Sequence, residues 1–230
     1  MNNLVNAYLI HAKSYRDTSL LIDFFTKEYG FITAVAKGIR TQSKNNKRGL
    51  LQPFGKLLIN WRGKSDLVTL NTVELANQPY VFKKNQLAFG FYINELIYYL
   101  CSNPKGIIYT GVFEIYENIL SKINADYHEK DIREFELELL SCLGYGLLFD
   151  NIDAKHYYGY DFTNGFFILN SSEQIQNKLN PLSLRGNLII NIMHRDWQDQ
   201  ETLIAAKKLL RSIIKYYIGD KELHSRKLFV

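Results

Sequence analysis

The sequence has little with which to hold a metal ion or to form disulfides. Its 230 residues include two cysteines, Cys101 and Cys142, which stand in separate apolar segments of helical character. The five histidines, at positions 11, 128, 156, 194 and 224, never fall three to five residues apart, the spacing of paired zinc ligands. We therefore expect no bound metal and two reduced cysteines in the core, as is usual in the cytosol.

Motifs of the common enzyme classes are also missing. There is no GxxxxGK[ST] phosphate loop, no GxGxxG after a strand and no GxSxG nucleophile elbow. Asp131, Glu134 and Glu138 share a face of a predicted helix, and we interpret them as a solvated face in which Lys130 and Glu134 form an ion pair. The chain is expected to bind, not to catalyse, and to need no cofactor.

Long apolar runs are absent as well. No uncharged apolar segment approaches the roughly 18 residues of a membrane span. Lys13 interrupts the N-terminal apolar stretch, which therefore does not resemble a signal peptide. These absences predict a cytoplasmic protein without a membrane partner.

Positive charge, by contrast, is concentrated in the first third. The chain has a formal net charge of +5, and residues 1–80 carry 11 Lys and Arg against 5 Asp and Glu, whereas the remainder carries 17 against 18. Residues 35–49, VAKGIRTQSKNNKRG, hold five cations and no acidic residue: Lys37, Arg40, Lys44, Lys47 and Arg48. Such an excess suggests a polyanionic partner for this part of the chain.

The same third has the pattern of a small closed sheet. Five short β-rich runs with turn residues between them occupy residues 3 to about 75, the size of a five-stranded OB-fold barrel. An SH3-like barrel is the alternative. We place a domain boundary near residue 80, which gives an OB-fold domain at 1–80 and a helical domain at 81–230, and hence an α+β protein.

The period changes to that of helices after Pro79. Expected helices span about 85–101, 106–123, 130–144, 184–195 and 199–218. Asn164-Gly165 predicts a type I′ hairpin within an insert at about 150–180. The last helix should bury a stripe comprising Leu203, Ala206, Leu210, Ile213, Ile214 and Tyr217.

A cationic barrel loop can bind the backbone of a nucleic acid, and neighbouring aromatic rings can stack on its bases. Tyr15, Tyr29, Phe31, Phe54 and Trp61 are the candidates, with packing in the barrel core as the alternative for each. Tyr15 and Trp61 stand out because each precedes an arginine at a strand end. The candidate nucleic-acid contacts are therefore Lys13, Tyr15, Arg16, Lys37, Arg40, Lys44, Lys47, Arg48, Trp61, Arg62 and Lys64.

Several motifs, in order along the chain, resemble the RecO family of bacterial recombination mediators. They are AYLIHAKSYRDTSLLIDFFTKEYGFITAVAKGIR at 7–40, LQPF at 51–54, WRGKSDLVTL at 61–70, FELELLSCLGYG at 135–146 and AKKLLRSIIKYYIGDKELHSRKL at 206–228. This resemblance spans the whole chain. It implies an N-terminal OB-fold, a helical domain, no active site, and binding and annealing of single- and double-stranded DNA in recombinational repair. It further implies partnership with RecR and with the C-terminal tail of the single-strand-binding protein SSB, so that RecA replaces SSB, and a place at the nucleoid.

One departure from the family concerns its metal. Many members resembling this chain carry a four-cysteine zinc site in the segment that matches about 150–180, and this segment has no cysteine. We interpret the hairpin as a zinc-less remnant in which aromatic packing replaces the metal. The rings concerned are Tyr157, Tyr158, Tyr160, Phe162, Phe166 and Phe167.

The SSB tail that the resemblance implies ends in acidic residues and an apolar residue with a free carboxylate. Such a ligand needs an apolar pocket with a cationic rim. Lys207, Arg211 and Lys215 form one helical stripe, with Lys208 beside it, and an ordinary solvated face is the alternative. A second candidate rim is Arg133 with Lys130 and Lys122, over a pocket near Phe113 or Tyr116.

Two other functions agree with the same charge pattern. An RNA-binding OB-fold protein of translation or tRNA handling would present the same cations, because both polymers carry phosphates. A non-catalytic scaffold with a solubilising loop is the third interpretation.

Overall fold

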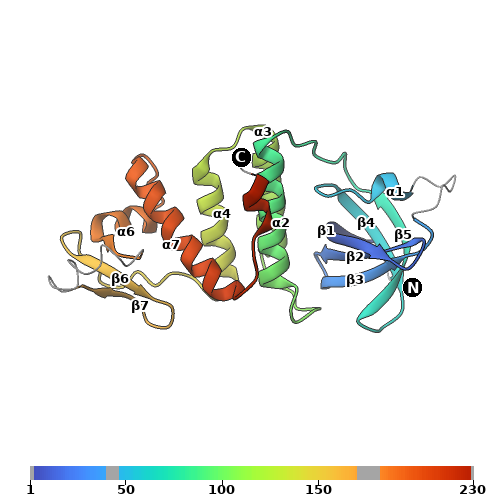
Figure 1. The fold of residues 1–230 in the computed structure, drawn as a ribbon, viewed down its shortest axis with the longest axis horizontal. Coiled ribbons are helices and arrows are strands. Elements are labelled where there is room, and N and C mark those ends of the chain that lie inside the picture. The colour runs from blue at the N-terminus through green and yellow to red at the C-terminus, as the bar shows by residue number, and fades with distance from the viewer. Residues whose placement is uncertain (1–2, 40–46, 170–181, 229–230) are drawn as a thin grey trace. The chain divides into compact units, whose positions relative to one another are not determined.

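The computed structural model describes residues 3–39, 47–169 and 182–228 (Figure 1). The chain forms two compact units, Met1–Asp126 together with Lys221–Val230, and Tyr127–Asp220. The first two long helices thus group with the N-terminal strands. A boundary between separately folding domains near residue 80 stays a prediction. In the part of the chain that the structure describes, no helix is long and apolar enough to cross a membrane.

A five-stranded closed barrel opens the first unit, which confirms the predicted OB-like barrel. The strands are β1 (Val5–Tyr15), β2 (Ser19–Thr26), β3 (Gly30–Ala36), β4 (Lys56–Arg62) and β5 (Leu67–Leu75), with the short helix α1 (Lys47–Leu50) before β4. Their order is β1-β2-β3-β5-β4, and only β3 and β5 pair in parallel among these neighbours. Alternate side chains such as Ile22, Phe24, Ala34 and Ala36 point inward and form the barrel core.

Two helices and the C-terminal segment complete this unit. Helix α2 (Asn85–Cys101) lies where the sequence predicted it, and α3 (Val112–Ala125) begins later than expected. The Tyr116 hydroxyl donates a buried hydrogen bond to Asn94 Oδ1 at 2.7 Å, which joins α3 to α2. The 3-10 helix η2 (His224–Leu228) lies along α2, because Glu95 accepts the backbone N–H groups of His224 and Ser225 at 2.9 and 3.0 Å.

The described residues of the second unit form three helices and a small sheet. The helices are α4 (Glu129–Cys142), α6 (Gly186–Met193) and α7 (Gln200–Ile218), and the sheet has the order β7-β6-β8, with strands Gly165–Ile168, Tyr157–Asp161 and Leu184–Arg185. Helices α4 and α7 pack together, and Lys207 Nζ lies 2.8 Å from Glu129 Oε1 across them. Helix α7 buries Leu209 and Ile218 in addition to most of the predicted stripe, whereas Leu203 and Tyr217 are only half-buried.

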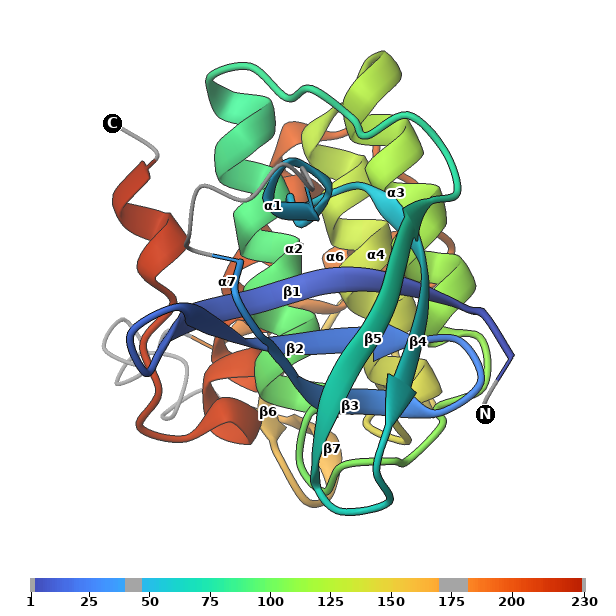
Figure 2. The ribbon, with the colours of Figure 1, turned by 90° about the vertical axis from the view of Figure 1, so that its right-hand side faces the viewer.

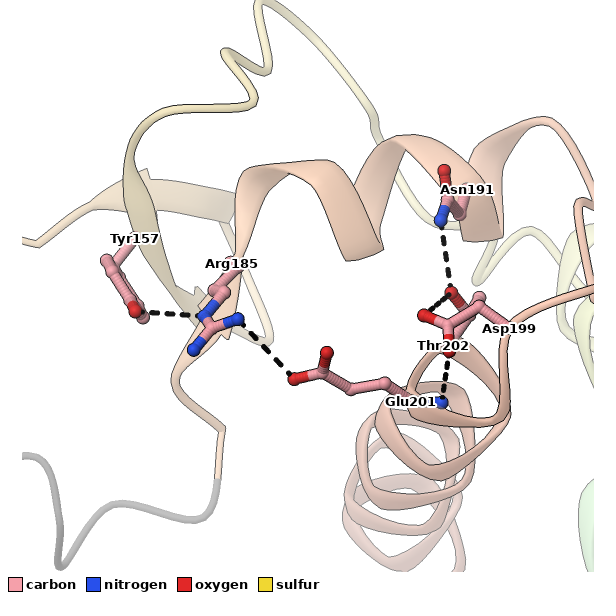
Figure 3. Close-up of polar contacts among 6 residues, drawn as sticks. All are labelled: Tyr157, Arg185, Asn191, Asp199, Glu201 and Thr202. Carbon is pink, nitrogen blue, oxygen red and sulfur yellow. Dashed lines mark hydrogen bonds and ion pairs between the residues drawn. The ribbon is translucent and has the colours of Figure 1, made fainter.

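Polar contacts attach both the small sheet and α6 to α7 (Figure 3). Arg185 Nε donates to the Tyr157 hydroxyl at 2.9 Å, and its Nη1 lies 3.7 Å from Glu201 Oε1. Asp199 caps α7 by accepting the Glu201 backbone N–H, and a satisfied cap of this kind stabilises a helix by about 1 kcal/mol. Asn191 donates to the Thr202 hydroxyl at 3.1 Å, which links α6 to the same helix end.

The β6–β7 hairpin exists, but its turn is not the predicted type I′. A type I′ turn needs a positive φ at both central residues, and of Asn164 and Gly165 only the glycine has one, at 80°. Strand pairing closes on Asp161 and Gly165, which leaves three residues in the loop. Asp161 Oδ1 accepts the backbone N–H groups of Thr163 and Asn164, so the acidic side chain stabilises this longer turn.

One of the two cysteines is not where the sequence predicted it. Cys101 is buried on α2, but Cys142 is exposed at the end of α4, and both are free thiols. The helix ends here because Gly144 has a φ of 80° and Tyr145 N–H donates to Leu140 O at 2.8 Å. Cys142 belongs to this terminal turn, so the helical periodicity placed it on the buried face wrongly.

Candidate nucleic-acid interface

The turn between β1 and β2 carries one group of the predicted contacts. Lys13 and Arg16 are exposed, and Tyr15 is half-buried between them. The Arg16 guanidinium carbon lies 5.3 Å from the centre of the Tyr15 ring, so the arginine packs over the ring while its charge faces solvent. A cation and a ring are thus presented together at this turn.

The basic loop leaves β3 at the same end of the barrel. Strand pairing sets Leu20 opposite Ala36, so the exposed Lys37 follows β3 on the side of the β1–β2 turn. Arg48 is exposed on α1. Arg40 and Lys44 lie outside the described residues, as does the side chain of Lys47.

The hairpin between β4 and β5 carries the second group. Arg62 and Lys64 are exposed, and Lys64 lines a shallow cavity of about 380 Å³. Trp61 corrects the expectation of an exposed ring, because it is only 7% exposed and belongs to the barrel core. Tyr29, 42% exposed, packs edge-on against it with ring centres 5.2 Å apart and is the ring that a base can reach here.

These two groups occupy different edges of the barrel (Figure 2). Leu20 and Ala36 pair at one end of the β2–β3 ladder, near Lys37, whereas Thr26 and Gly30 pair at the other, next to Tyr29. The sequence alone did not predict that the two groups of contact residues lie at different edges. In OB-folds the β1–β2 and β4–β5 loops both flank the nucleic-acid site. We call the exposed set the barrel cations; they are Lys13, Arg16, Lys37, Arg48, Arg62 and Lys64.

The outer face of β2 and β3, which OB-folds use for binding, is covered here by helices. Phe25 packs on Phe113 of α3 with ring centres 5.4 Å apart, and Phe31 packs on Tyr98 of α2 at 6.2 Å. Phe31 is therefore a packing residue, and so is Phe54, which is 3% exposed. The pattern of apolar residues on both sides of Asp23 in β2 is the sequence signal for this covered face.

Carboxylates of α3 pair with two other lysines of the barrel, Lys27 in the β2–β3 turn and Lys56 at the start of β4. Lys27 Nζ lies 2.8 Å from Glu114 Oε1, and Lys56 Nζ lies 2.7 Å from Glu117 Oε1. Burial, together with the hydrogen bond that its hydroxyl donates to Glu117, raises the pKa of Tyr8 far above its usual value. The positive electrostatic field at the barrel surface therefore comes mainly from the barrel cations.

Asp23 is the carboxylate of β2, and its charge is held by neighbours. Burial acts to raise its pKa, but hydrogen bonds from His11 and Thr33 outweigh burial, so the pKa lies below its usual value. His11 Nδ1 lies 3.5 Å from Asp23 Oδ2. A carboxylate compensated in this way weakens the positive field less than a free one.

The helix α7 presents the predicted cationic stripe in part. Lys208 and Arg211 are exposed, whereas Lys207 pairs with Glu129 and Lys215 donates to Gly219 O at 2.7 Å. The alternative rim loses its central member, because Arg133 is 5% exposed and its Nη1 lies 2.6 Å from Glu136 Oε2. A buried, paired arginine cannot serve as an exposed rim.

Aromatic rings cluster at the β6–β7 hairpin, where the sequence predicted that aromatic packing takes the place of a zinc site. Tyr160 packs on Phe162 and Phe166, and Phe162 stacks on Tyr216 of α7 with ring centres 4.3 Å apart. Burial raises the pKa of Tyr160 to about 12. The other predicted rings differ: Tyr157 and Tyr158 use their hydroxyls as acceptors, and Phe167 is exposed and lies over Gly159. Within the described ranges, no three metal-ligating side chains come together.

Comparison with known proteins decides the family. The family model for the N-terminal part of recombination protein O matches residues 1–79, and the model for its C-terminal part matches residues 84–227. The chain belongs to the RecO family. It is 39% identical over 235 residues to the DNA repair protein RecO of Cellvibrio japonicus, which covers 99% of this chain and 96% of that protein. It is 34% identical over 238 residues to RecO of Pasteurella multocida, with coverages of 100% and 95%.

Membership confirms the resemblance on which the sequence analysis relied. RecO proteins are non-enzymatic recombination mediators, in agreement with the expectation that this chain binds and does not catalyse. The family implies DNA and partners of the RecF pathway.

Proposed function

We propose that this chain is a cytoplasmic, nucleoid-associated recombination mediator that binds single- and double-stranded DNA and anneals complementary strands. It acts with RecR and the C-terminal tail of SSB so that RecA can replace SSB on DNA. The observation that carries the proposal is the pairing of RecO-family membership with exposed cations on both loop edges of the barrel.

The barrel cations contact phosphates in this proposal, and so do Arg40, Lys44 and Lys47 of the same loop. Lysine and arginine contacts to phosphate release counterions and carry no sequence information, which suits a mediator that must act on any sequence. Tyr15 and Tyr29 offer rings to bases at the two edges. Because α2 and α3 cover the β2–β3 face, the bound DNA strand follows the edges of the barrel in this proposal.

The SSB tail is assigned to α7 through Lys208 and Arg211, with Lys207 and Lys215 at the sides. The two exposed cations are available to acidic residues, and Lys207 would have to exchange Glu129 for the tail. Arg133→Glu is unsuitable as a test of the alternative rim, since it would bury a second carboxylate beside Glu136.

The tail assignment is tested by fluorescence anisotropy with a labelled tail peptide. Lys208→Glu with Arg211→Glu should weaken binding at least tenfold, which corresponds to about 1.4 kcal/mol. Lys130→Glu, on exposed surface of α4, is the matched control and should bind normally. If Lys130→Glu weakened binding and the double variant of α7 bound normally, the tail site would lie on the central helices.

Annealing of complementary strands, naked and coated with SSB, tests the proposed function as a whole. The chain should accelerate annealing of both, and deletion of the SSB tail should remove the effect on coated strands only. A competition between matched DNA and RNA oligomers distinguishes the RNA-binding alternative. Failure to anneal naked DNA, or strong preference for RNA, would contradict the proposal.

A further inference from the structure

A second, larger cavity lies in the first unit, and none of the barrel cations lines it. Its volume is about 630 Å³, and it is bounded by β1 residues from Leu9 to Ala12, by α2 and by η2. Cavities that hold small molecules have volumes of this order.

Flat rings make up much of its wall. The His11 and Tyr98 rings lie 5.3 Å apart at an angle of 35°, and Tyr99 follows with its centre 5.6 Å from that of Tyr98. Phe91 of α2 lines the same cavity. Walls of this kind suit a planar aromatic ligand that stacks on them, since offset and tilted ring pairs are favourable.

One polar group in the wall lacks a partner. Asn94 is 3% exposed, and its Oδ1 accepts the Tyr116 hydroxyl, but its Nδ2 has no hydrogen-bond acceptor among the described residues. A buried donor without an acceptor is destabilising, so the Asn94 side chain favours a ligand that supplies an acceptor. A ring nitrogen or carbonyl oxygen on a planar ligand meets this need.

The cavity has a fixed third wall. Glu95 accepts the N–H groups of His224 and Ser225 and the Ser225 hydroxyl, which holds η2 against α2. These three donors already occupy the Glu95 carboxylate. It therefore presents less negative charge to a ligand than a free carboxylate would.

Strand β1 connects the cavity with the proposed DNA-binding edge. Successive side chains of a strand alternate, so His11, Lys13 and Tyr15 lie on one face of β1 and lead from the cavity to the β1–β2 turn. Lys221 Nζ lies 5.4 Å from the Tyr99 ring centre on another side. Cations that can contact a backbone thus stand beside a site that can hold a ring.

We propose that this cavity binds a single unstacked nucleobase of a bound DNA strand, stacked against the wall that the His11, Tyr98 and Tyr99 rings form, beside Asn94. This inference rests on the proposed function, because it supplies a base-holding site beside the phosphate contacts. Holding one base out of the stack at a fixed point keeps its neighbours available for pairing with a second strand.

A comparison of two oligomers tests the site with the full chain. One is a thymidine 12-mer, and the other is a 12-mer of abasic residues with the same phosphates. Stacking contributes roughly fivefold to a hundredfold in affinity per base, so His11→Ala and Tyr98→Leu should each lower the ratio of the two affinities about fivefold or more. His11→Phe restores a ring without restoring the contact to Asp23, and should keep the ratio within about twofold of the unchanged chain.

Photocrosslinking locates the base independently. A thymidine 12-mer with 5-iododeoxyuridine, irradiated on the chain and mapped by mass spectrometry, should crosslink to His11, Tyr98 or Tyr99. Crosslinks confined to Tyr29, Tyr15 or the second unit, or an unchanged affinity ratio in His11→Ala, would overturn the cavity while leaving DNA binding intact. Absence of binding to the thymidine 12-mer would overturn the proposed function and the cavity together.

Discussion

At the scale of single residues, burial decides what a charge can do. Arg133 and Glu136 stand one helical turn apart on α4 and are 5% and 0% exposed, with a 2.6 Å contact between them. Their sequence context, a charged residue every second or third position, is equally typical of a solvated helix face. Only long-range packing distinguishes a buried ion pair from a solvated helix face. The prediction that Trp61 is exposed failed for the same reason, because its burial depends on contacts with residues distant in the sequence.

The buried pair makes a sharp prediction for stability. Arg133→Met should lower the free energy of unfolding by about 3–5 kcal/mol, because it leaves the Glu136 carboxylate buried without its counterion. The double variant Arg133→Met with Glu136→Leu removes both charges and should recover most of the loss. Urea unfolding measures both, and a single variant as stable as the double would show that the pair is not buried in solution.

At the scale of elements, the sequence predicted types better than ends. The five strands and the helix at 85–101 follow directly from hydrophobic period, which many residues determine together. The start of α3 and the loop of the β6–β7 hairpin depend on a few local contacts, such as the Asp161 hydrogen bonds, which no periodicity records. The helices that cover the β2–β3 face could not be predicted from local patterns, because the contacts join residues far apart in the sequence, such as Phe25 and Phe113.

The turn between β2 and β3 depends on one glycine. Gly30 has a φ of 62°, and a Cβ there would lie 2.2 Å from Ile107 O, whereas Gly38, with a φ of 69°, has open space around it. Gly38→Ala should cost only the strain of the left-handed backbone, about 1 kcal/mol. Gly30→Ala adds a clash with backbone and should cost about 3 kcal/mol or more. Equal losses for the two variants in thermal or urea unfolding would contradict this account.

The aromatic hairpin should fold without zinc. Metal analysis of the purified chain should find no stoichiometric zinc, and a chelator should leave the melting temperature unchanged, since residues 150–180 contain one histidine and no cysteine, whereas a structural zinc site needs four such ligands. Phe162→Ala should instead lower stability by about 1–3 kcal/mol, because it removes the stack on Tyr216. Stoichiometric zinc, or unfolding in the chelator, would refute the replacement of metal by rings.

At the scale of the whole molecule, the account assigns binding of the DNA backbone to the barrel. Charge composition alone indicated the first third of the chain, because residues 1–80 contain 11 basic and 5 acidic residues. The structure adds that Lys27 and Lys56 are paired with carboxylates of α3, so they are not equivalent to the loop cations. That difference provides the control for the central test.

The salt dependence of single-strand binding tests this claim most directly. Affinity for a thymidine oligomer is measured across salt concentrations for the unchanged chain, for Lys37→Ala with Arg40→Ala and Arg48→Ala, and for a control in which the paired Lys27 and Lys56 are changed to Ala. Each phosphate contact contributes about −0.7 to the log–log slope, so the loop variant should have a slope less negative by about two and the control an unchanged slope. A loop variant with the slope of the unchanged chain would contradict the assignment of DNA binding to the barrel.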